Sequence, residues 1–311
     1  MEKQYYYSFT DYCKKTFGRK LYRVALDAGM TCPNRDGKID TRGCIFCDEG
    51  GSGDFAIPYE GQKLEKSDLI YNHQEANEGE YIAYFQAYTN TYDTIDRLYF
   101  LFSSALKNPL FAGISIATRP DCIQEETIQL FQQLQIEFPN KFIWIELGLQ
   151  TIHSKSAIFI RRGYSLSVFD TCVKQLHSIN IPVITHIIIG LPNESKEDMI
   201  QTIQHLNDLK VDGIKLQLLH YLKGCDLGRM YENNSTLFHV LTQEEYTDII
   251  VDCIGHLNEN VVIHRLTGDG AGELLLAPTW SKDKRSVLNQ IRHKLKENHI
   301  QQGCLLTNCE K

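Results

Sequence analysis

The sequence lacks any long uninterrupted run of apolar residues. Runs such as 187–189 are far shorter than the roughly 20 residues that a helix needs to cross a bilayer. The opening Met-Glu-Lys-Gln-Tyr-Tyr-Tyr is not followed by an apolar segment of the kind that a secretory signal contains. These absences argue against a membrane span and a signal peptide, and we expect a cytoplasmic protein.

An excess of positive charge is also missing. The chain has 32 Lys and Arg against 39 Asp and Glu, a formal net charge of −7 and a pI near 5.9. This balance excludes a general basic coat that holds nucleic acid through its phosphates. Any RNA contact therefore needs a local basic patch. Basic residues cluster near both ends of the chain, where they are either contacts for RNA phosphates or solvated faces of helices. They are Lys14, Lys15, Arg19 and Lys20, and then Lys282, Lys284, Arg285, Arg292, Lys294 and Lys296.

Low-complexity tracts, close internal repeats and Pro- or Ser-rich linkers are absent as well. Apolar residues make up 42% of the sequence and charged residues 23%, which is an ordinary globular composition. We therefore expect the chain to be folded throughout. The simplest organisation is a barrel domain at 1–225 with an extension at 226–311 that packs on the barrel.

Short β-branched segments alternate with longer helical patterns along the chain, which is typical of a parallel sheet with crossover helices. The six strand-and-helix units predict an α/β fold: a partial (β/α)6 barrel of the TIM type with a C-terminal α/β extension. The expected barrel strands are 21–26, 81–87, 113–118, 142–149, 182–189 and 213–219. The expected barrel helices are 62–75, 94–107, 125–137, 167–178 and 196–209. In the extension we expect helix 243–257, strand 261–266 and helix 286–297.

Polar side chains follow the ends of the expected strands. In α/β barrels the residues that do chemistry project from these carboxyl ends and from the loops that follow them. Each of these residues also has a structural interpretation, because polar side chains at strand ends cap helices and satisfy loop backbone. The set comprises Tyr88, Thr89, Asn90, Thr118, Arg119, Asp121, Glu146, Gln150, His186, Gln217 and His220.

Ten cysteines in a cytosolic chain favour metal or thiol chemistry over disulfides. Eleven residues separate Cys32 from Cys44, and two separate Cys44 from Cys47. For most of the others we expect burial as small apolar side chains, although a second metal at Cys225, Cys304 or Cys309 stays open. The scattered cysteines are Cys13, Cys122, Cys172, Cys225, Cys253, Cys304 and Cys309.

The grouped thiolates of Cys32, Cys44 and Cys47 suit either zinc or an iron-sulfur cluster. A structural zinc site normally has a fourth ligand, for which the nearby sequence offers only the distant His73. A 4Fe-4S cluster held by three cysteines leaves one iron open for a substrate or cofactor. The presence of three cysteine ligands instead of four favours the iron-sulfur cluster. The alternative is a zinc-stabilised RNA-binding protein without catalysis.

The cysteine loop and its surroundings resemble the radical SAM superfamily, in which three cysteines follow the first barrel strand and an aromatic residue precedes the last one. Phe46 has that place. The common superfamily gap between the first two cysteines is three residues, whereas the long gap here is similar to that of the Elongator catalytic subunit and of the bacterial YtqA/YhcC-like group. The likeness to the bacterial group extends along nearly the whole chain. It is carried by the segments 84–92 (YFQAYTNTY), 118–122 (TRPDC), 146–151 (ELGLQT), 190–192 (GLP), 264–269 (HRLTGD) and 277–280 (APTW).

The resemblance implies a 4Fe-4S cluster on Cys32, Cys44 and Cys47, S-adenosylmethionine on the open iron, and an electron donor such as flavodoxin or ferredoxin. It also implies that the segment after the second strand contacts the methionine amino group, although this chain has no Gly-Gly-Glu there. Arg162 is placed to pair with the methionine carboxylate, with a surface ion pair as its alternative, and Gly190 approaches adenine or simply packs against its neighbours. The implied cofactor contacts are Phe46, Gln86, Tyr88, Thr89, Asn90, Glu146, Gln150, Arg162 and Gly190.

For the substrate, the resemblance implies the wobble uridine of tRNA. More narrowly, it implies conversion of a 5-carboxymethylaminomethyl side chain to a 5-aminomethyl side chain. The acidic net charge supports an alternative, a radical SAM enzyme that acts on a peptide or small metabolite. The loop from Gly268 to Gly272 lacks the Lys and Ser/Thr of a P-loop and predicts a tight turn, and Trp280 beyond it is a candidate for closing the barrel mouth or stacking on a base.

Overall fold

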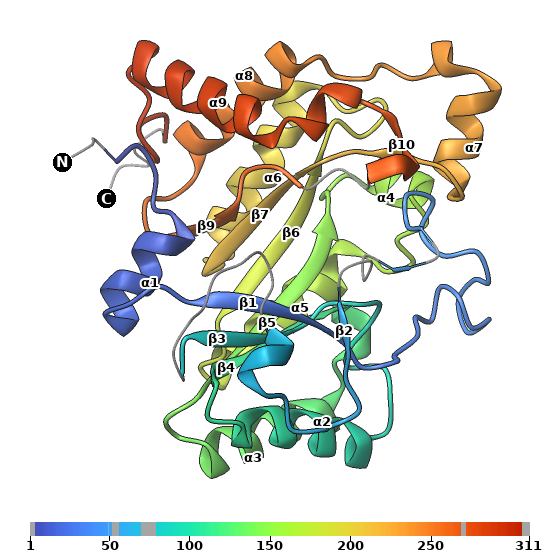
Figure 1. Ribbon diagram of the computed structural model, residues 1–311. Helices are drawn as coiled ribbons and strands as arrows, with labels where there is room; N and C mark the ends of the chain where they lie inside the picture. Colours follow the sequence, from blue (N-terminus) through green and yellow to red (C-terminus); the bar gives the residue numbers. More distant parts are fainter. Residues whose placement is uncertain (1–3, 49, 52–55, 70–78, 269–271, 307–311) are drawn as a thin grey trace.

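A curved parallel sheet is the centre of the molecule (Figure 1). The computed structural model describes residues 4–48, 50–51, 56–69, 79–268 and 272–306. In Figure 1 helices α2 and α3 lie below β3 and β4, and α8 and α9 lie at the opposite side of the sheet. Among the described residues, no helix combines the length and apolar character needed to cross a membrane.

The described sheet has eight strands in the order β2-β1-β3-β4-β5-β6-β7-β9, and all neighbouring strands are parallel. The six strands predicted for the barrel are present, which confirms the partial α/β barrel. A short antiparallel pair, β8 with β10, lies outside this sheet. The strands are β1 (Tyr22–Asp27), β2 (Ile57–Pro58), β3 (Tyr81–Phe85), β4 (Phe111–Thr118), β5 (Phe142–Gln150), β6 (Val183–Ile189), β7 (Gly213–Leu218), β8 (Tyr221–Leu222), β9 (Val262–Arg265) and β10 (Leu275–Ala277).

Apart from 62–75, the expected crossover helices agree with the structure to within about two residues, whereas α1, α4, α7 and the short β2, β8 and β10 were not predicted. The helices are α1 (Phe9–Phe17), α2 (Ile95–Lys107), α3 (Glu125–Glu137), α4 (Ser154–Phe159), α5 (Leu166–Ser178), α6 (Lys196–Asp208), α7 (Asp226–Asn233), α8 (Gln243–His256) and α9 (Lys284–Glu297). Single 3-10 turns lie at Lys66–Leu69, Pro120–Cys122, Ser235–Leu237, Gly272–Leu274 and Thr279–Lys282.

The prediction of a helix at 62–75 is wrong in its described part, 62–69, which contains only one 3-10 turn. The local backbone bonds to side chains instead of to a helical ladder. The backbone N–H of Glu65 donates to Asp68 Oδ2 at 2.8 Å, and Asn108 Nδ2 donates to the Leu64 carbonyl at 2.9 Å. Polar side chains of this kind compete with helix formation. Residues 70–75 of the predicted helix lie outside the described residues.

The strands present two faces of different character, because successive side chains point to opposite sides of a sheet. On β5, Ile145 and Leu147 belong to the apolar core, which also contains residues of the crossover helices. Glu146 lies between them on the other face, inside the curve of the sheet. The helix-facing side therefore stabilises the fold, and the inward face is available for polar groups.

The two edge strands of the described sheet, β2 and β9, do not pair with each other, so a seam remains in the barrel. Helix α1 lies beside β9 at this seam. Ser8 forms an isolated parallel bridge with Ile263, and the Ile263 N–H donates to the Tyr7 carbonyl at 2.9 Å. The Phe9 ring lies 5.1 Å from the His264 ring. The start of the chain thus contacts a strand of the predicted extension, and that strand continues the barrel sheet.

Candidate active site

The three grouped cysteines lie on the loop that follows β1. Backbone bonds order this loop: Arg35 N–H donates to the Cys32 carbonyl at 2.8 Å, and Cys47 N–H donates to the Cys44 carbonyl at 3.1 Å. The loop is also tied to distant elements, since Leu227 N–H of α7 donates to the Ile45 carbonyl at 2.8 Å. All three cysteines line one cavity of about 360 Å³.

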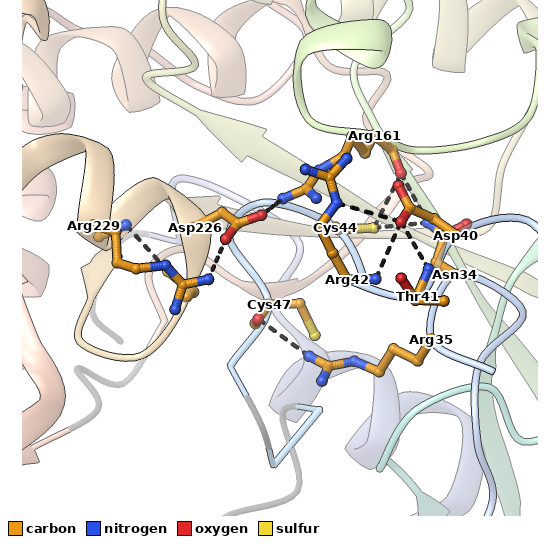
Figure 2. Close-up of polar contacts among 12 residues, drawn as sticks. Asn34, Arg35, Asp40, Thr41, Arg42, Cys44, Cys47, Arg161, Asp226 and Arg229 are labelled. Carbon is orange, nitrogen blue, oxygen red and sulfur yellow. Dashed lines mark hydrogen bonds and ion pairs between the residues drawn. The ribbon is translucent and has the colours of Figure 1, made fainter. Parts of the chain in front are cut away.

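Polar groups lie beside Cys44 and Cys47 (Figure 2). Asn34 Nδ2 lies 3.4 Å from Cys44 Sγ and donates to the Arg161 carbonyl at 2.8 Å. Arg35 donates to the Cys47 carbonyl at 3.1 Å. Burial raises the pKa of Cys47 to about 12, and Arg35 opposes this rise. The thiolate form therefore needs additional positive charge, which the irons of a cluster supply.

The donor set at the cysteine cavity consists of the three thiols of Cys32, Cys44 and Cys47. Three cysteines fit a 4Fe-4S cluster, in which one iron stays open for a cofactor. A structural zinc site normally has a fourth ligand, and His73, the residue that the sequence offered for that place, lies outside the described residues.

The cysteine cavity brings together most of the side chains for which a cofactor contact was predicted. Among the described residues, Asn90 and Gly190 do not line it. Asn90 is buried and joins two strand ends, since Nδ2 donates to the Phe85 carbonyl at 3.1 Å and to the Ala117 carbonyl at 2.9 Å. The predicted residues that line the cavity are Phe46, Gln86, Tyr88, Thr89, Glu146, Gln150 and Arg162.

Gly190 has a structural role after β6. Its φ is +88°, which favours glycine, and a Cβ there would lie 2.8 Å from Leu241 Cδ1. The packing alternative therefore accounts for Gly190 without a bound cofactor. An approach of Gly190 to adenine remains a prediction.

The guanidinium of Arg162 is buried and bonds to loop backbone. Nε donates to the Tyr164 carbonyl at 3.1 Å, and Nη1 donates to the carbonyls of Leu149 and Thr151 at 2.9 and 2.6 Å. The alternative of a surface ion pair is wrong, because the side chain is buried and its partners are carbonyls. Arg162 holds the end of β5 and the loop after it. A contact with the methionine carboxylate remains a prediction.

Glu146 lies at the centre of a polar network inside the barrel. Its Oε1 accepts a hydrogen bond from Ser115 Oγ at 2.8 Å and lies 3.8 Å from Arg23 Nε. Its Oε2 accepts hydrogen bonds from His186 Nε2 at 2.7 Å and from Lys215 Nζ. Both carboxylate oxygens are thus engaged within the protein. The predicted contact of Glu146 with the cofactor would have to compete with these bonds.

The charge states in this network follow from its burial. Burial opposes the ionisation of Glu146, but Lys215 and His186 hold its pKa well below the usual range. Burial and the charge of Lys215 together lower the pKa of His186 to about 4. Burial also lowers the pKa of Lys215, but the Glu146 carboxylate opposes this change and favours the charged ammonium group. Near neutral pH the barrel interior therefore holds an anionic Glu146 beside a neutral His186.

Sequence reasoning identified Glu146 and His186 but missed Arg23, Tyr84 and Lys215. In the segment 213–218 (GIKLQL) polar and apolar residues alternate. This alternation already places Lys215 and Gln217 on one face of the strand and the apolar residues on the other. A Lys in the middle of an apolar strand is a signal of an inward-facing partner, since lysine is almost never fully buried unless it is paired. Tyr84 completes this pairing by accepting a hydrogen bond from Lys215 Nζ at 3.2 Å.

A larger cavity, of about 610 Å³, lies at the opposite end of the strands. Tyr12, Trp144, Asn258 and His264 are among its lining residues, and no cysteine lines it. In α/β barrels the amino ends of the strands serve stability, whereas the carboxyl ends carry the chemistry. The cysteine cavity is therefore the candidate active site although it is the smaller of the two.

The scattered cysteines follow the expected pattern of burial with one exception. Cys13, Cys122, Cys172, Cys225 and Cys253 are buried, and Cys304 is exposed. Cys225 caps α7, since its Sγ accepts a hydrogen bond from Gly228 N–H at 3.3 Å. No second metal group appears among the described residues, and Cys309 lies outside them.

Two candidates from the C-terminal segment, Trp280 and Lys294, make structural contacts, and a role of Trp280 in closing the barrel mouth or stacking on a base remains a prediction. Trp280 Nε1 donates to the Leu241 carbonyl at 2.9 Å, and its ring lies 5.6 Å from that of Tyr246 on α8. Lys294 is buried and pairs with Asp248 at 2.6 Å, so it is removed from the basic surface cluster. The predicted turn at 268–272 lies largely outside the described residues, which omit 269–271.

Comparisons of sequence identify the family. The chain matches the Radical SAM superfamily over residues 41–206 and the Radical_SAM C-terminal domain over residues 211–297. YtqA of Bacillus subtilis (strain 168) is 38% identical over 308 residues, which are 98% of this chain and 94% of that protein. YhcC of Escherichia coli (strain K12) is 29% identical over 294 residues, which are 94% of this chain and 92% of that protein.

Two further matches cover part of the chain. The tRNA uridine(34) acetyltransferase of Methanocaldococcus jannaschii is 24% identical over 190 residues, which are 60% of this chain and 33% of that protein. The solved structure of the archaeal Methanocaldococcus infernus Elp3 with an N-terminal deletion has a TM-score of 0.60 at 16% identity. That match covers 71% of this chain and 55% of the solved chain, so this protein spans about half of its length. Together with the cysteine loop and its cavity, the family matches show that this chain belongs to the radical SAM superfamily, whose enzymes use a 4Fe-4S cluster and S-adenosylmethionine.

Proposed function

We propose that this radical SAM enzyme modifies the wobble uridine of tRNA by converting a 5-carboxymethylaminomethyl side chain to a 5-aminomethyl side chain. The observation that carries the proposal is the similarity over 60% of the chain to a protein named for its action on uridine 34 of tRNA. The fold that it shares with the archaeal Elp3 is compatible with this substrate.

In this proposal Cys32, Cys44 and Cys47 hold the cluster at the cavity. When bound, the cluster and S-adenosylmethionine supply one-electron cleavage of the sulfur–C5′ bond and abstraction of a hydrogen atom from the substrate. The protein orients the cofactor and keeps water away from the reacting atoms. Phe46, Gln86 and Tyr88 line the cavity on the cluster side and are suited to both tasks.

The proposed conversion balances with S-adenosylmethionine as the two-electron acceptor. The N–CH2 unit of the carboxymethylamino group loses two electrons and two protons and becomes an imine, and water hydrolyses the imine to the aminomethyl uridine and glyoxylate. One hydrogen atom leaves in 5′-deoxyadenosine, one leaves as a proton, and methionine is the other product. The cluster returns to the oxidation state in which it started.

The partners in this proposal are tRNA and a cytoplasmic electron donor such as flavodoxin or ferredoxin. Radical SAM enzymes require a reductant to bring the cluster to the reduced state that cleaves the cofactor. In the proposed conversion the substrate returns that electron, so the donor serves to prime the enzyme. Exposed basic residues on α1 and α9, among them Lys14, Arg285 and Arg292, are available to tRNA phosphates. Because the rest of the chain is acidic overall, such contacts must be confined to these patches.

The test compares tRNA nucleosides from cells with and without the gene, followed by reaction of the reconstituted enzyme with the isolated tRNA. We expect carboxymethylaminomethyl uridine to accumulate in the deletion strain. The purified enzyme should convert it while forming 5′-deoxyadenosine and glyoxylate. Unchanged wobble uridines in both experiments would reject the tRNA substrate and favour a peptide or small metabolite.

A further inference from the structure

An irregular register between β7 and β9 turns Arg265 toward the barrel interior. The pairing runs Gly213 with Val262 and Ile214 with Ile263, and then shifts so that Lys215 is opposite Arg265. Without the shift, His264 would be the partner of Lys215. Bulges of this kind re-aim side chains near active sites. As a result, Arg265 lines the cysteine cavity together with Glu146 and His186.

The interior around Arg265 has more cationic than anionic side chains. Arg23 and Lys215 both pair with Glu146, which is the carboxylate of this network. Arg265 adds a further positive charge within electrostatic range of Arg23 and Lys215. Within the described chain, Arg265 has neither a hydrogen bond nor an ion pair from its side chain. Among the described residues, the Arg265 guanidinium is therefore a cation that no carboxylate pairs with directly, in a protein whose net charge is −7.

A third cavity, of about 350 Å³, opens at the seam beside β9 and α1. Its described lining includes Arg23, Lys215, Arg265 and Lys284 and contains no Asp or Glu. Arg265 lines both this cavity and the cysteine cavity, and so it lies between the two. A space of this charge and position suits an anionic group that reaches the cluster side from the seam.

We propose that Arg265 binds a carboxylate of the substrate, with Lys215 and Arg23 behind it as supporting cations. This inference rests on the proposed function, since the carboxymethylaminomethyl group ends in a carboxylate. The planar guanidinium is suited to hold a carboxylate by two parallel hydrogen bonds. Held in this way, the carboxylate keeps the neighbouring N–CH2 unit in a fixed position in the cavity.

The methionine part of S-adenosylmethionine is the other source of a carboxylate. Different cations lie on the cluster side: Arg35 contacts Cys47, and Arg119 lies within electrostatic range of Cys32. Arg265 belongs instead to the group around Lys215. The geometry therefore assigns Arg265 to the substrate, and the experiment separates the two sources.

The first experiment uses the reconstituted holoenzyme and two tRNAs, one with the carboxymethylaminomethyl group and one with its uncharged amide. We expect Arg265→Met to lower kcat/KM for the carboxylate tRNA by about 10- to 100-fold, the usual range for a charged hydrogen-bond pair, with little change for the amide tRNA. Arg265→Lys should recover part of the loss. Arg229→Met, at an exposed arginine of α7, is the matched control.

Binding of S-adenosylmethionine distinguishes the two sources of carboxylate. If Arg265 serves the substrate, the affinity of Arg265→Met for S-adenosylmethionine equals that of the wild type. A weakened affinity, or an equal loss of kcat/KM for both tRNAs, would overturn the assignment of Arg265 to the substrate.

A second experiment does not depend on tRNA modification. N-methylglycine has the amine and carboxylate of the proposed side chain, and N-methylglycinamide lacks the carboxylate. We expect N-methylglycine to raise the Tm of the wild-type holoenzyme and of Arg229→Met, but not that of Arg265→Met, while the amide has no effect. Such a result alongside unmodified tRNA would reject the proposed function and keep the anion site. An equal Tm shift in Arg265→Met, or no shift in any protein, would reject the site.

Discussion

Glu146 on β5 and Lys215 on β7 form a buried ion pair across the intervening strand β6. His186 of β6 contacts the same carboxylate from between the two strands. One network therefore joins three consecutive strands inside the barrel. Burying an ion pair offers little net stability, but removal of one partner is costly because it leaves the other charge uncompensated.

Substitution of the pair should therefore be strongly non-additive. We expect Glu146→Gln to lower the free energy of unfolding by about 3 kcal/mol, since Lys215 and Arg23 lose their counter-charge. Lys215→Met in the Glu146→Gln background should recover part of that loss. Urea unfolding of the two single variants and the double variant measures the coupling. Additive losses would show that the two side chains do not interact in solution.

Acid sensitivity should follow from His186. Its pKa is about 4 in the folded protein, against about 6.5 in an unfolded chain. Between these values the unfolded chain binds more protons, so stability rises with pH across this window and is lost as the pH falls through it. The lowered pKa of Glu146 acts in the same direction at lower pH.

We expect His186→Gln to flatten the dependence of unfolding free energy on pH between about 4 and 6.5, by at most about 1.4 kcal/mol per pH unit. Chemical denaturation at several pH values measures the slope. The exposed His293→Gln should retain the wild-type slope. An unchanged slope in His186→Gln would mean that this histidine does not become protonated on unfolding.

Cys32 offers a sharp test of the cluster, because it precedes the segment 41–206 that matches the family. We expect Cys32→Ala to lose the iron and the visible absorption of the reconstituted protein and to form no 5′-deoxyadenosine. Cys44→Ala should behave in the same way. The exposed Cys304→Ser is the control and should keep the full iron content. Retention of iron and activity by Cys32→Ala would remove this residue from the ligand set.

Gly190 and Gly224 allow backbone strain to be separated from packing. Both have a φ of +88°, but a Cβ at Gly190 would meet Leu241, whereas one at Gly224 would meet nothing within 4 Å. Gly224→Ala should lower the free energy of unfolding by about 1 kcal/mol through strain. Gly190→Ala should lower it by about 1 to 3 kcal/mol more because of overpacking. Equal losses in the two variants would argue against the contact with Leu241.

Binding measurements on Gly190→Ala test the remaining prediction for this residue. If Gly190 serves packing alone, the affinity for S-adenosylmethionine stays at the wild-type value after correction for the unfolded fraction. A large specific loss of affinity would support the predicted approach to adenine. Isothermal titration of the reconstituted protein distinguishes the two outcomes.

Local patterns were sufficient for the main elements of the fold. The helix 125–137 and the strands around Glu146 and His186 were predicted because apolar periodicity is a local property of the sequence. Helix α1 was missed although Ser8 caps it locally by accepting a hydrogen bond from the Asp11 N–H. Its position, in contrast, depends on contacts of Ser8 and Phe9 with β9, far away in the chain. Propensity alone does not report such contacts.

The sequence by itself determined the alternation of strands and helices and the grouping of three thiolates on one loop, because periodicity and donor chemistry are both local. Only the tertiary structure decided that Arg162 bonds to loop carbonyls, that Lys215 meets Glu146 and that Arg265 turns inward. Each of these depends on which strands pair and in which register, and a shift of one residue moves a side chain to the other face of the sheet.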